Sequence, residues 1–342
     1  MSTQINPTRI GIDIGFGDTK LARLTAAGRI STLTFASIVG RAETHTAADV
    51  GLGSTKKNIQ TIEYNGEAYF IGEGAIVESR LASTRQDQSR IGSIEEKVLL
   101  LAALNRAKIT DALIVTGLPV LWWNERKTLV KSWKGTHKFK ANGKPQTVTI
   151  REVRPVWQPL GSFYTRFLHT DGTANTDEQI LMRGFGIIDI GMNTTDLTGL
   201  DKLQPVGKWT AGVRVGVRDA LEVISADIEK RFQVRRDLIE LSVDLRKTGT
   251  TTLWRTTYTM DQIGGSALKS LGQRIVSETT RQWGQGDRFH TVLITGGGAA
   301  LVGDHVKAAF PHNAEILKNP GEANAIGFAK FAQRKIFRSD RK

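Results

Sequence analysis

The sequence contains no cysteine, few prolines and no long apolar segment. Without cysteine, the chain can form no disulfides, thiolate nucleophiles or cysteine-based zinc sites. Only 8 of the 342 residues are proline, which argues against long disordered linkers. No apolar run approaches the roughly 20 residues of a membrane span, and the first residues, MSTQINPTR, lack the apolar core of a signal peptide. We therefore expect a cytoplasmic globular protein.

Histidine and charge patterns point to no metal centre and to no particular partner. The six histidines are scattered, with no spacing typical of metal ligands. The formal net charge of +13 fits nucleic acid, acidic lipid or an acidic protein as partner, and equally a generally basic surface. The one dense basic group is the C-terminal tail, with Arg334, Lys335, Arg338, Arg341 and Lys342. Because charge alone supports direct DNA contact, we do not favour it.

An internal repeat divides the chain. At 342 residues the chain exceeds what one hydrophobic core usually fills, so two domains are expected. Residues 9–25 read RIGIDIGFGDTKLARLT, and residues 186–201 read GIIDIGMNTTDLTGLD. At one constant offset the segment IDIG occurs in both copies, and Thr19, Leu21 and Leu24 match Thr195, Leu197 and Leu200. The repeat predicts two related domains that face each other.

Each copy has the pattern of a three-stranded meander, in which period-2 runs are separated by short turns. The third strands are expected at residues 30–35 and 203–209. Elsewhere, helical spacing at 94–107, 124–134, 217–232, 263–283 and 324–336 alternates with apolar strands at 112–115 and 291–294, and a small hairpin is expected around residues 142–145. Hairpins mixed with crossover helices predict an α/β fold with mixed sheets.

The two Asp-Ile-Gly turns have the composition of a phosphate site. Glycine lets backbone N–H groups approach a phosphate closely, and Asp13 and Asp189 stand at the strand ends beside these turns. Two carboxylates presented from opposite walls suit hydrated Mg²⁺. Lys20 follows the first turn and is placed to neutralise phosphate, whereas the second copy has Asp196 there. The alternative, that Asp and Gly merely form hairpin turns, is weakened by the duplication.

Two common nucleotide motifs are absent. The cluster Gly15-Phe16-Gly17 has Lys20 where a dinucleotide fingerprint needs its third glycine, and it leads into a strand instead of a helix. No Gly-Lys-Ser/Thr follows a glycine-rich stretch, so a Walker A loop is excluded.

Two further segments carry candidate ligand contacts. The run VLITGGGAA places Gly296, Gly297 and Gly298 directly after an apolar strand, where α/β folds bind nucleotides. A flexible connection is the alternative. Gln158 is polar among apolar neighbours and suits the orientation of an attacking water; it equally suits a buried amide that bonds to backbone.

Five motifs in order resemble those of the actin/Hsp70/sugar-kinase superfamily. The two repeats resemble its phosphate-1 and phosphate-2 motifs, and VLITGGGAA resembles its adenosine motif. TGLP at residues 116–119, with Gln158 beyond it, resembles the first connecting motif, and NAIG at 324–327 the second. The resemblance implies two duplicated ribonuclease H-like (actin-like ATPase) domains around a nucleotide cleft. Domain I would comprise residues 1–165 plus 325–342, and domain II residues 166–324.

The resemblance also implies roles for the matched residues. Asp13 and Asp189 would coordinate Mg²⁺ through water, and Gln158 would position the lytic water, so these three residues would carry the hydrolysis of ATP. The triplet Gly296, Gly297 and Gly298 would face the adenosine. The phosphates would be held by Gly15, Gly17, Lys20, Gly191, Asn193 and Thr194.

Within the superfamily the chain looks most like plasmid-partition actins of the ParM/StbA type. YFIGEGA at 69–75, GLPV with the basic helix after it, the small hairpin and the compact length carry this resemblance. It implies a polymerising ATPase that forms head-to-tail filaments and segregates plasmid DNA through an adaptor protein that binds DNA. Many partition actins have glutamate where Gln158 stands.

Two other functions remain open from the sequence. A small-metabolite kinase of the same superfamily would need an acidic base near the cleft, and Gln158 is unsuited to that role. A membrane-tethered actin-like protein would use the basic tail FAKFAQRKIFRSDRK on anionic lipid. We favour a terminal helix packed on its own domain, and no membrane contact.

Overall fold

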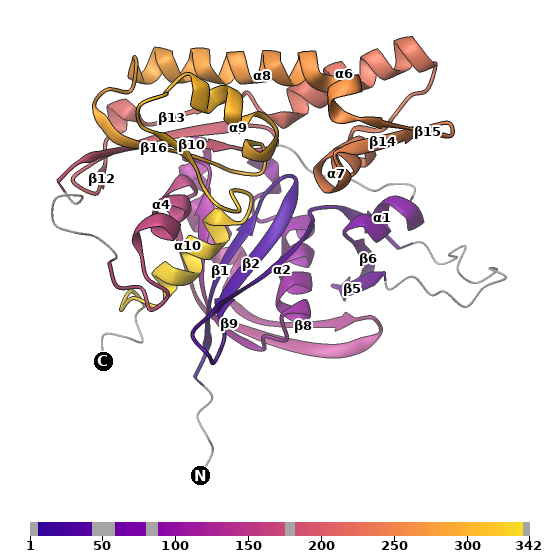
Figure 1. The fold of residues 1–342 in the computed structure, drawn as a ribbon. Coiled ribbons are helices and arrows are strands. Elements are labelled where there is room, and N and C mark those ends of the chain that lie inside the picture. The colour runs from indigo at the N-terminus through magenta and orange to yellow at the C-terminus, as the bar shows by residue number, and fades with distance from the viewer. Residues whose placement is uncertain (1–5, 43–58, 80–87, 175–181, 338–342) are drawn as a thin grey trace.

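A computed structural model describes residues 6–42, 59–79, 88–174 and 182–337. Two β-sheets lie one above the other in Figure 1, with a pair of helices, α4 and α10, in the region between them. The model is a mixed α/β structure with two domains, as the sequence predicts.

The first sheet has mixed strand directions. Its central strands are buried on both faces, and the meander predicted for the first repeat forms one edge. In spatial order its nine strands are β3 (Ile30–Ala36), β2 (Asp18–Leu24), β1 (Thr8–Ile14), β7 (Asp111–Leu118), β9 (Lys144–Trp157), β8 (Gly135–Ala141), β5 (Gln60–Tyr64), β6 (Glu67–Ile71) and β4 (Val39–Arg41).

Helix α2 (Ile94–Arg106) covers one face of this sheet. The side chain of Ser93 caps the helix by accepting a hydrogen bond from the Glu96 N–H, and acidic residues occupy the first turn, where the helix dipole favours them. Its apolar residues 98–104 are fully buried against the sheet. The remaining elements of this part are α1 (Glu73–Glu78), α3 (Arg126–Trp133) and the short 3₁₀ turns η2 (Gln88–Arg90) and η3 (Val120–Glu125).

The second sheet repeats the plan with fewer strands. In spatial order they are β12 (Gln204–Pro205), β11 (Thr195–Asp201), β10 (Gly184–Ile190), β16 (Phe289–Thr295) and β17 (Ala314–Ile316), with β13 (Ala211–Val213) also paired to β11. The long helices α6 (Val217–Phe232), α8 (Met260–Trp283) and α9 (Ala299–Ala308) pack on its outer face. Beside them lie α7 (Leu238–Thr248) and the hairpin β14 (Thr250–Leu253) with β15 (Thr256–Thr259).

Two helices are exchanged between the sheets. Helix α4 (Pro159–Phe167) follows a strand of the first sheet, yet its phenylalanines pack on the second. Helix α10 (Ala323–Ala332) follows the second sheet and packs on β1, β2 and β7 of the first. The helices cross where a Cβ on Gly327 would lie 1.7 Å from the Gly161 carbonyl oxygen, so only glycine fits there.

The strand register confirms the internal repeat. β1 pairs with β2 so that Asp13 faces Lys20, and β10 pairs with β11 so that Asp189 faces Asp196. The helix predicted at residues 217–232 has the observed bounds of α6. In addition, β1 pairs in parallel with β7, and β10 pairs in parallel with β16, so the two sheets share this arrangement as well.

The third strand predicted for the second repeat is wrong in extent. Residues 203–209 contain only the two-residue strand β12 and the 3₁₀ turn η4 (Gly207–Trp209). Proline at position 205 cannot donate to a ladder and Gly207 favours a turn, so the chain breaks there, and β13 supplies the next pairing.

The C-terminal segment packs onto the first sheet. Phe328 and Phe337 are fully buried beside Leu113 and Val115, so these aromatic rings are not available to a lipid surface. Residues 338–342 of the predicted basic tail lie outside the described residues. Within the described residues, none of the helices combines the length and apolarity that crossing a bilayer requires. The predicted domain boundaries near residues 165 and 324 stay a prediction.

Candidate functional site in the cleft between the two sheets

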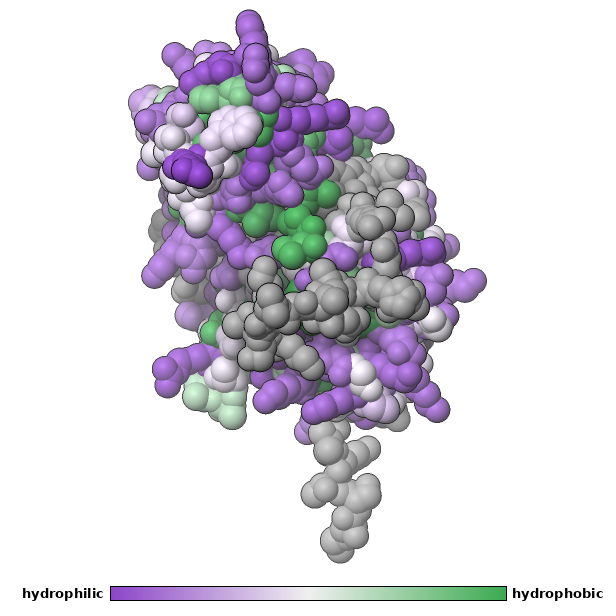
Figure 2. All heavy atoms as spheres, turned by 90° about the vertical axis from the view of Figure 1, so that its right-hand side faces the viewer, coloured by the Kyte–Doolittle hydropathy of each residue, from purple (hydrophilic) through white to green (hydrophobic). Residues whose placement is uncertain are grey.

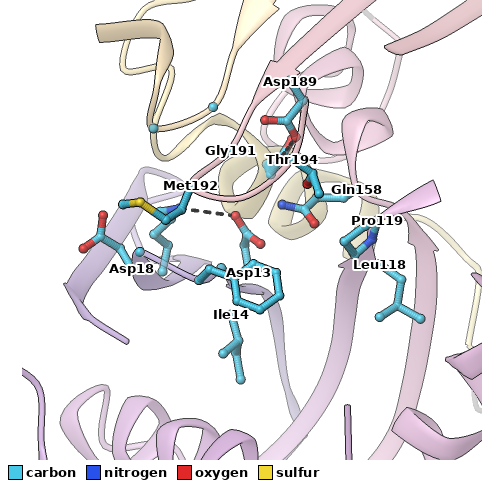
Figure 3. A pocket seen from close by; sticks show the side chains of 18 of the residues that line it. Asp13, Ile14, Asp18, Leu118, Pro119, Gln158, Asp189, Gly191, Met192 and Thr194 are labelled. Atoms are coloured by element: carbon cyan, nitrogen blue, oxygen red, sulfur yellow. Dashed lines mark hydrogen bonds and ion pairs between the residues drawn. The ribbon is translucent and has the colours of Figure 1, made fainter. Parts of the chain in front are cut away.

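The two Asp-Ile-Gly turns have the same backbone bond and face each other. The Gly15 N–H donates to the Asp18 carbonyl (3.0 Å), and at the equivalent place the Gly191 N–H donates to the Thr194 carbonyl (2.8 Å). Figure 3 shows the turn with Gly191 and Met192 approaching from one side and Asp13 and Ile14 from the other. The duplication therefore places two like turns on opposite walls of one pocket.

Asp13 and Asp189 lie at the ends of β1 and β10 and are both buried. The Asp13 carboxylate pairs with the Lys20 ammonium at 3.5 Å. Asp189 accepts a hydrogen bond from the Asn324 amide at 2.7 Å. Burial raises the pKa of Asp189 to about 6, the Asn324 bond lowers it, and the charge of Asp13 raises it again. The influence of Asp13 shows that the two carboxylates share one electrostatic environment.

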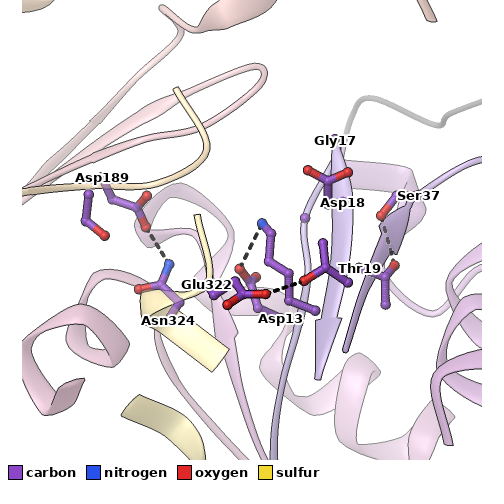
Figure 4. A network of polar contacts seen from close by, with 12 residues as sticks. Asp13, Gly17, Asp18, Thr19, Ser37, Asp189, Glu322 and Asn324 are labelled. Carbon is purple, nitrogen blue, oxygen red and sulfur yellow. Dashed lines mark hydrogen bonds and ion pairs between the residues drawn. The ribbon is translucent and has the colours of Figure 1, made fainter. Parts of the chain in front are cut away.

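A buried polar network holds Asp189 in place, and Figure 4 shows its hydrogen bond with Asn324. The Asn324 side-chain oxygen accepts from the Ser162 backbone N–H (3.0 Å) and from its hydroxyl (2.7 Å). The Ser162 hydroxyl also lies 2.7 Å from that of Thr295. This network links both exchanged helices to the strand ends of the second sheet.

Nearly all the predicted site residues meet in this pocket, which is closed in the present structure. Its cavity is about 80 Å³, smaller than the few hundred Å³ of typical ligand pockets, so a nucleotide enters only when the lining groups move apart. The predicted residues that line it are Asp13, Gly15, Gly17, Lys20, Gln158, Asp189, Gly191, Thr194, Gly296, Gly297 and Gly298. Asn193 does not line it; it faces a neighbouring hollow beside Arg218 and Trp122.

Gln158 stands at the start of α4, and its backbone N–H donates to the Leu118 carbonyl at 2.9 Å. In Figure 3 its side-chain amide points into the pocket between Asp13 and Thr194. The amide makes no hydrogen bond with any described residue. The alternative role considered for Gln158, a buried amide that bonds to the backbone, therefore does not agree with the structure.

The three glycines after β16 differ in what they contact. A Cβ on Gly296 or Gly298 would lie within 2.5 Å of Asp189 or Ile190, so close packing explains both. At Gly297 a Cβ would meet nothing within 4 Å, so this residue borders open space in the pocket. Helix α9 begins at Ala299, directly after the third glycine.

Sequence reasoning missed several residues of the pocket, because elements remote in sequence bring them there. Arg246 reaches in from α7, and its guanidinium pairs with the Asp18 carboxylate. Arg90 and Trp122 come from the 3₁₀ turns η2 and η3. Asn324 was noticed in a motif, but its contact with Asp189 needs the fold.

Asp196 occupies the place that Lys20 has in the first repeat. Burial raises the pKa of this carboxyl to about 8, the neighbouring Asp189 raises it further, and a hydrogen bond from the Val120 backbone lowers it. The first repeat therefore pairs an acid with a cation, whereas the second sets two acids opposite each other in the strand register, and Asp196 is not among the residues that line the pocket.

Helix α7 closes the rim of the cleft. Ile239 and Val243 of this helix pack in one cluster with Phe70 of the first sheet and with Ile38, which lies between β3 and β4. The Lys247 ammonium lies 2.5 Å from the Glu73 carboxylate of α1. Figure 2 shows apolar surface between the polar upper and lower parts of this side of the molecule. The hollow between α1 and α7 is lined by apolar side chains that include Ile59, Ile71, Val77 and Val243.

The acids of the pocket suit a hydrated divalent cation. Two buried carboxylates face one cavity, and Lys20 is the cation paired with one of them. The described residues contain no group of three or more His, Cys, Asp or Glu side chains placed to hold a metal. Mg²⁺ is typically bound by one or two carboxylates together with water and phosphate, and Asp13 and Asp189 fit the protein part of such a donor set.

Comparisons with known proteins agree over most of the chain. A family model for the N-terminal domain of actin-like proteins matches residues 11–161, and one for the C-terminal domain of MreB-like archaeal actin homologues matches residues 187–308. An archaeal actin homologue of Thermoplasma volcanium is 25% identical over 348 residues, which cover 96% of this chain and 99% of that protein.

Solved structures share the fold. The crystal structure of an archaeal actin homologue has a TM-score of 0.78 at 21% identity, covering 95% of this chain and 99% of that one; its complex with ADP has a TM-score of 0.75. A ParM protein, solved as a 15-stranded filament from Clostridium botulinum, has a TM-score of 0.75 at 23% identity and covers 96% and 99% of the two chains. With two like domains, two opposed turns and these matches, the chain belongs to the actin-like ATPase superfamily.

Proposed function

We propose that this chain binds Mg-ATP in the cleft, hydrolyses it and assembles head to tail into filaments. The observation that carries the proposal is the pair of equivalent turns that bring Asp13 and Asp189 to opposite walls of one pocket. The ADP complex of an archaeal actin homologue and the filament of a ParM protein support it by likeness of fold.

Each residue has a defined part in this proposal. The N–H groups of the two turns and the Lys20 ammonium would hold phosphate, and Gly297 leaves room for the adenosine. Asp13 and Asp189 would hold Mg²⁺ through water, and the bound ion would neutralise phosphate charge. The Gln158 amide would orient the attacking water by hydrogen bonding. Asn193 belongs to the second turn and stays a proposed phosphate contact, although it lines a neighbouring hollow.

The proposed role is segregation of plasmid DNA in the cytoplasm through an adaptor that binds DNA. The net charge of +13 supports an acidic partner or the DNA-bound adaptor complex. Filament formation is proposed from the likeness of fold to the ParM filament.

The test follows phosphate release and light scattering together across a protein concentration series with Mg-ATP. Asp189→Asn removes a proposed metal ligand and should abolish release, whereas Asp201→Asn, at the exposed end of the neighbouring strand, should not change it. Gln158→Ala should slow release by about 100-fold with little loss of nucleotide affinity, because it misplaces only the water.

The shape of the concentration series separates the two parts of the proposal. Release that rises sharply above a critical concentration, together with scattering, supports a polymerising ATPase. Release proportional to protein without scattering would retain the nucleotide site and reject the filament. No nucleotide-dependent signal of either kind would reject both.

A further inference from the structure

Arg90 is a buried cation in the cleft that the proposed nucleotide site does not yet use. It ends the 3₁₀ turn η2, directly before α2, and only 5% of its surface is exposed. It lines the same pocket as Asp13, Gly15 and Gln158. A fully buried arginine is uncommon unless an anion or a set of acceptors compensates for its lost hydration.

The contacts of Arg90 satisfy only some of the hydrogen-bond donors of its guanidinium group. Nη1 donates to the Gly15 carbonyl at 2.8 Å, and the guanidinium lies over the Phe16 ring, 5.0 Å from its centroid. Both contacts are with the first phosphate turn. Nη2 is buried and has no hydrogen-bond partner among the described residues. A buried donor without an acceptor is costly, so this arrangement is incomplete as it stands.

The neighbouring carboxylates do not supply the acceptor that Nη2 of Arg90 lacks. Burial lowers the pKa of Arg90 to about 10, and the charges of Glu96, Asp13 and Glu95 raise it, so the group stays protonated at neutral pH. None of the described carboxylates is in ion-pair contact with it. The Glu96 carboxylate accepts instead from the Gly92 N–H (2.8 Å) and from the Trp133 indole (3.1 Å).

We infer that Arg90 binds the terminal phosphate of the nucleotide, with Nη2 as the donor. This inference rests on the proposed function and adds a specificity-determining residue to it. Arg90 packs against the first turn, in the domain opposite Gly297, where the adenosine is proposed. A nucleotide oriented in this way directs its phosphates toward Lys20 and Arg90. An anion there supplies the acceptor that Nη2 lacks, and a buried charge-assisted bond of this kind is strong.

A purely supporting role for Arg90 gives a different expectation. If its only task were to hold the Gly15 carbonyl, its loss would disturb every nucleotide equally, because all of them contact the turn. A contact with the terminal phosphate discriminates between ATP and ADP instead, since ADP lacks that group. The ratio of the two affinities therefore separates the two roles.

The experiment measures dissociation constants for a non-hydrolysable ATP analogue and for ADP, both with Mg²⁺, in the full chain and in Arg90→Gln and Arg90→Lys. The matched control is Arg126→Gln. Arg126 also donates to a backbone carbonyl, that of Trp123 at 3.1 Å, and lies over an aromatic ring, but it is not among the residues that line the pocket. Thermal unfolding of each variant establishes that it is folded.

We expect Arg90→Gln to weaken the ATP analogue about tenfold or more relative to ADP. Arg90→Lys, which keeps the charge, should restore part of this ratio, and Arg126→Gln should leave it unchanged. An equal loss for both nucleotides in folded Arg90→Gln and Arg90→Lys would overturn the inference and leave the nucleotide site intact. If the unaltered chain bound neither nucleotide, the proposed function and this inference would fall together.

Discussion

Lys97 shows how a single buried charge can make stability depend on pH. It lies on α2 with 6% of its surface exposed, and its ammonium donates to the Ser132 carbonyl. Burial lowers its pKa from 10.5 to about 8, although the Glu96 charge raises it. Below pH 8 both folded and unfolded chains carry the charge, and the folded chain bears its full burial cost. Between about pH 8 and 10.5 only the unfolded chain keeps the proton.

We therefore predict that Lys97 becomes less destabilising as the pH rises through this window. The stability of the unaltered chain, measured by urea unfolding at pH 7.5 and pH 9.5, should rise relative to Lys97→Met. Lys131→Met, which alters an exposed lysine of α3, is the control for other titrating groups. Parallel pH profiles for the unaltered chain and Lys97→Met would contradict the prediction.

The residues of the pocket that could be predicted from the sequence are those that belong to a recognisable local motif. Asp13 and Asp189 were found because the same short segment occurs twice, and duplication is improbable for a turn with no function. Arg90 and Arg246 carry no such signal: each is one arginine in an ordinary turn or helix, and only the fold brings it to the cleft. Asn193 was predicted from its place in the second turn, and the structure puts it in a neighbouring hollow that Thr194 also lines, so its contact with phosphate stays a prediction.

At the scale of elements, α7 connects the two domains beside the pocket. It spans from the second domain to α1 and β2 of the first through two ion pairs, Arg246 with Asp18 and Lys247 with Glu73. The first pair is mostly buried, while the second is largely exposed and therefore contributes little. Because the cavity is too small for a nucleotide, we expect these contacts to break and re-form during exchange.

We predict that Arg246→Gln speeds the release of a fluorescent nucleotide several-fold, while Lys247→Gln changes it less than twofold. Stopped-flow displacement by excess unlabelled nucleotide measures the rate. Lys269→Gln, an exposed change on the outer helix α8, controls for net charge. Release from Arg246→Gln at the rate of the unaltered chain would show that α7 does not limit exchange.

Elements were predictable where their pattern was long and regular. The bounds of α6 agree with the helical spacing, and α2 differs by one residue. The hairpin around residue 143 was predicted too short, because β9 continues to Trp157 with side chains of mixed polarity that hide the alternation. The short elements β12 and η4 were not predicted, because Pro205 and Gly207 interrupt the strand that the alternating pattern of residues 203–209 predicts.

At the scale of the whole molecule, the two domains are held together by the crossing of α4 and α10. The crossing depends on Gly161 and Gly327, because a Cβ at position 327 would lie 1.7 Å from the Gly161 carbonyl. The duplication predicted two facing domains, but the exchange of helices was beyond sequence reasoning: it depends on which sheet each apolar face contacts, and periodicity does not report that.

We predict that Gly327→Ala destabilises the protein by about 1–3 kcal/mol or more, because the added methyl forces the helices apart. Gly265→Ala on α8 is the matched control, since a Cβ there meets nothing within 4 Å; this change should stabilise the chain by about 0.4–1 kcal/mol. Urea unfolding measures both. Equal stability of Gly327→Ala and the unaltered chain would show that the crossing tolerates a wider separation.

The position of α10 has a consequence for how the molecule is made. The helix covers β1, β2 and β7, so the first sheet gains its inner covering from residues 323–337, which follow the whole second sheet in the sequence. While the ribosome is still adding the second domain, Leu113 and Val115 lack the covering that Phe328 and Phe337 give them in the folded chain. During translation, the first domain therefore exposes this face until the ribosome has passed the second domain and has made α10.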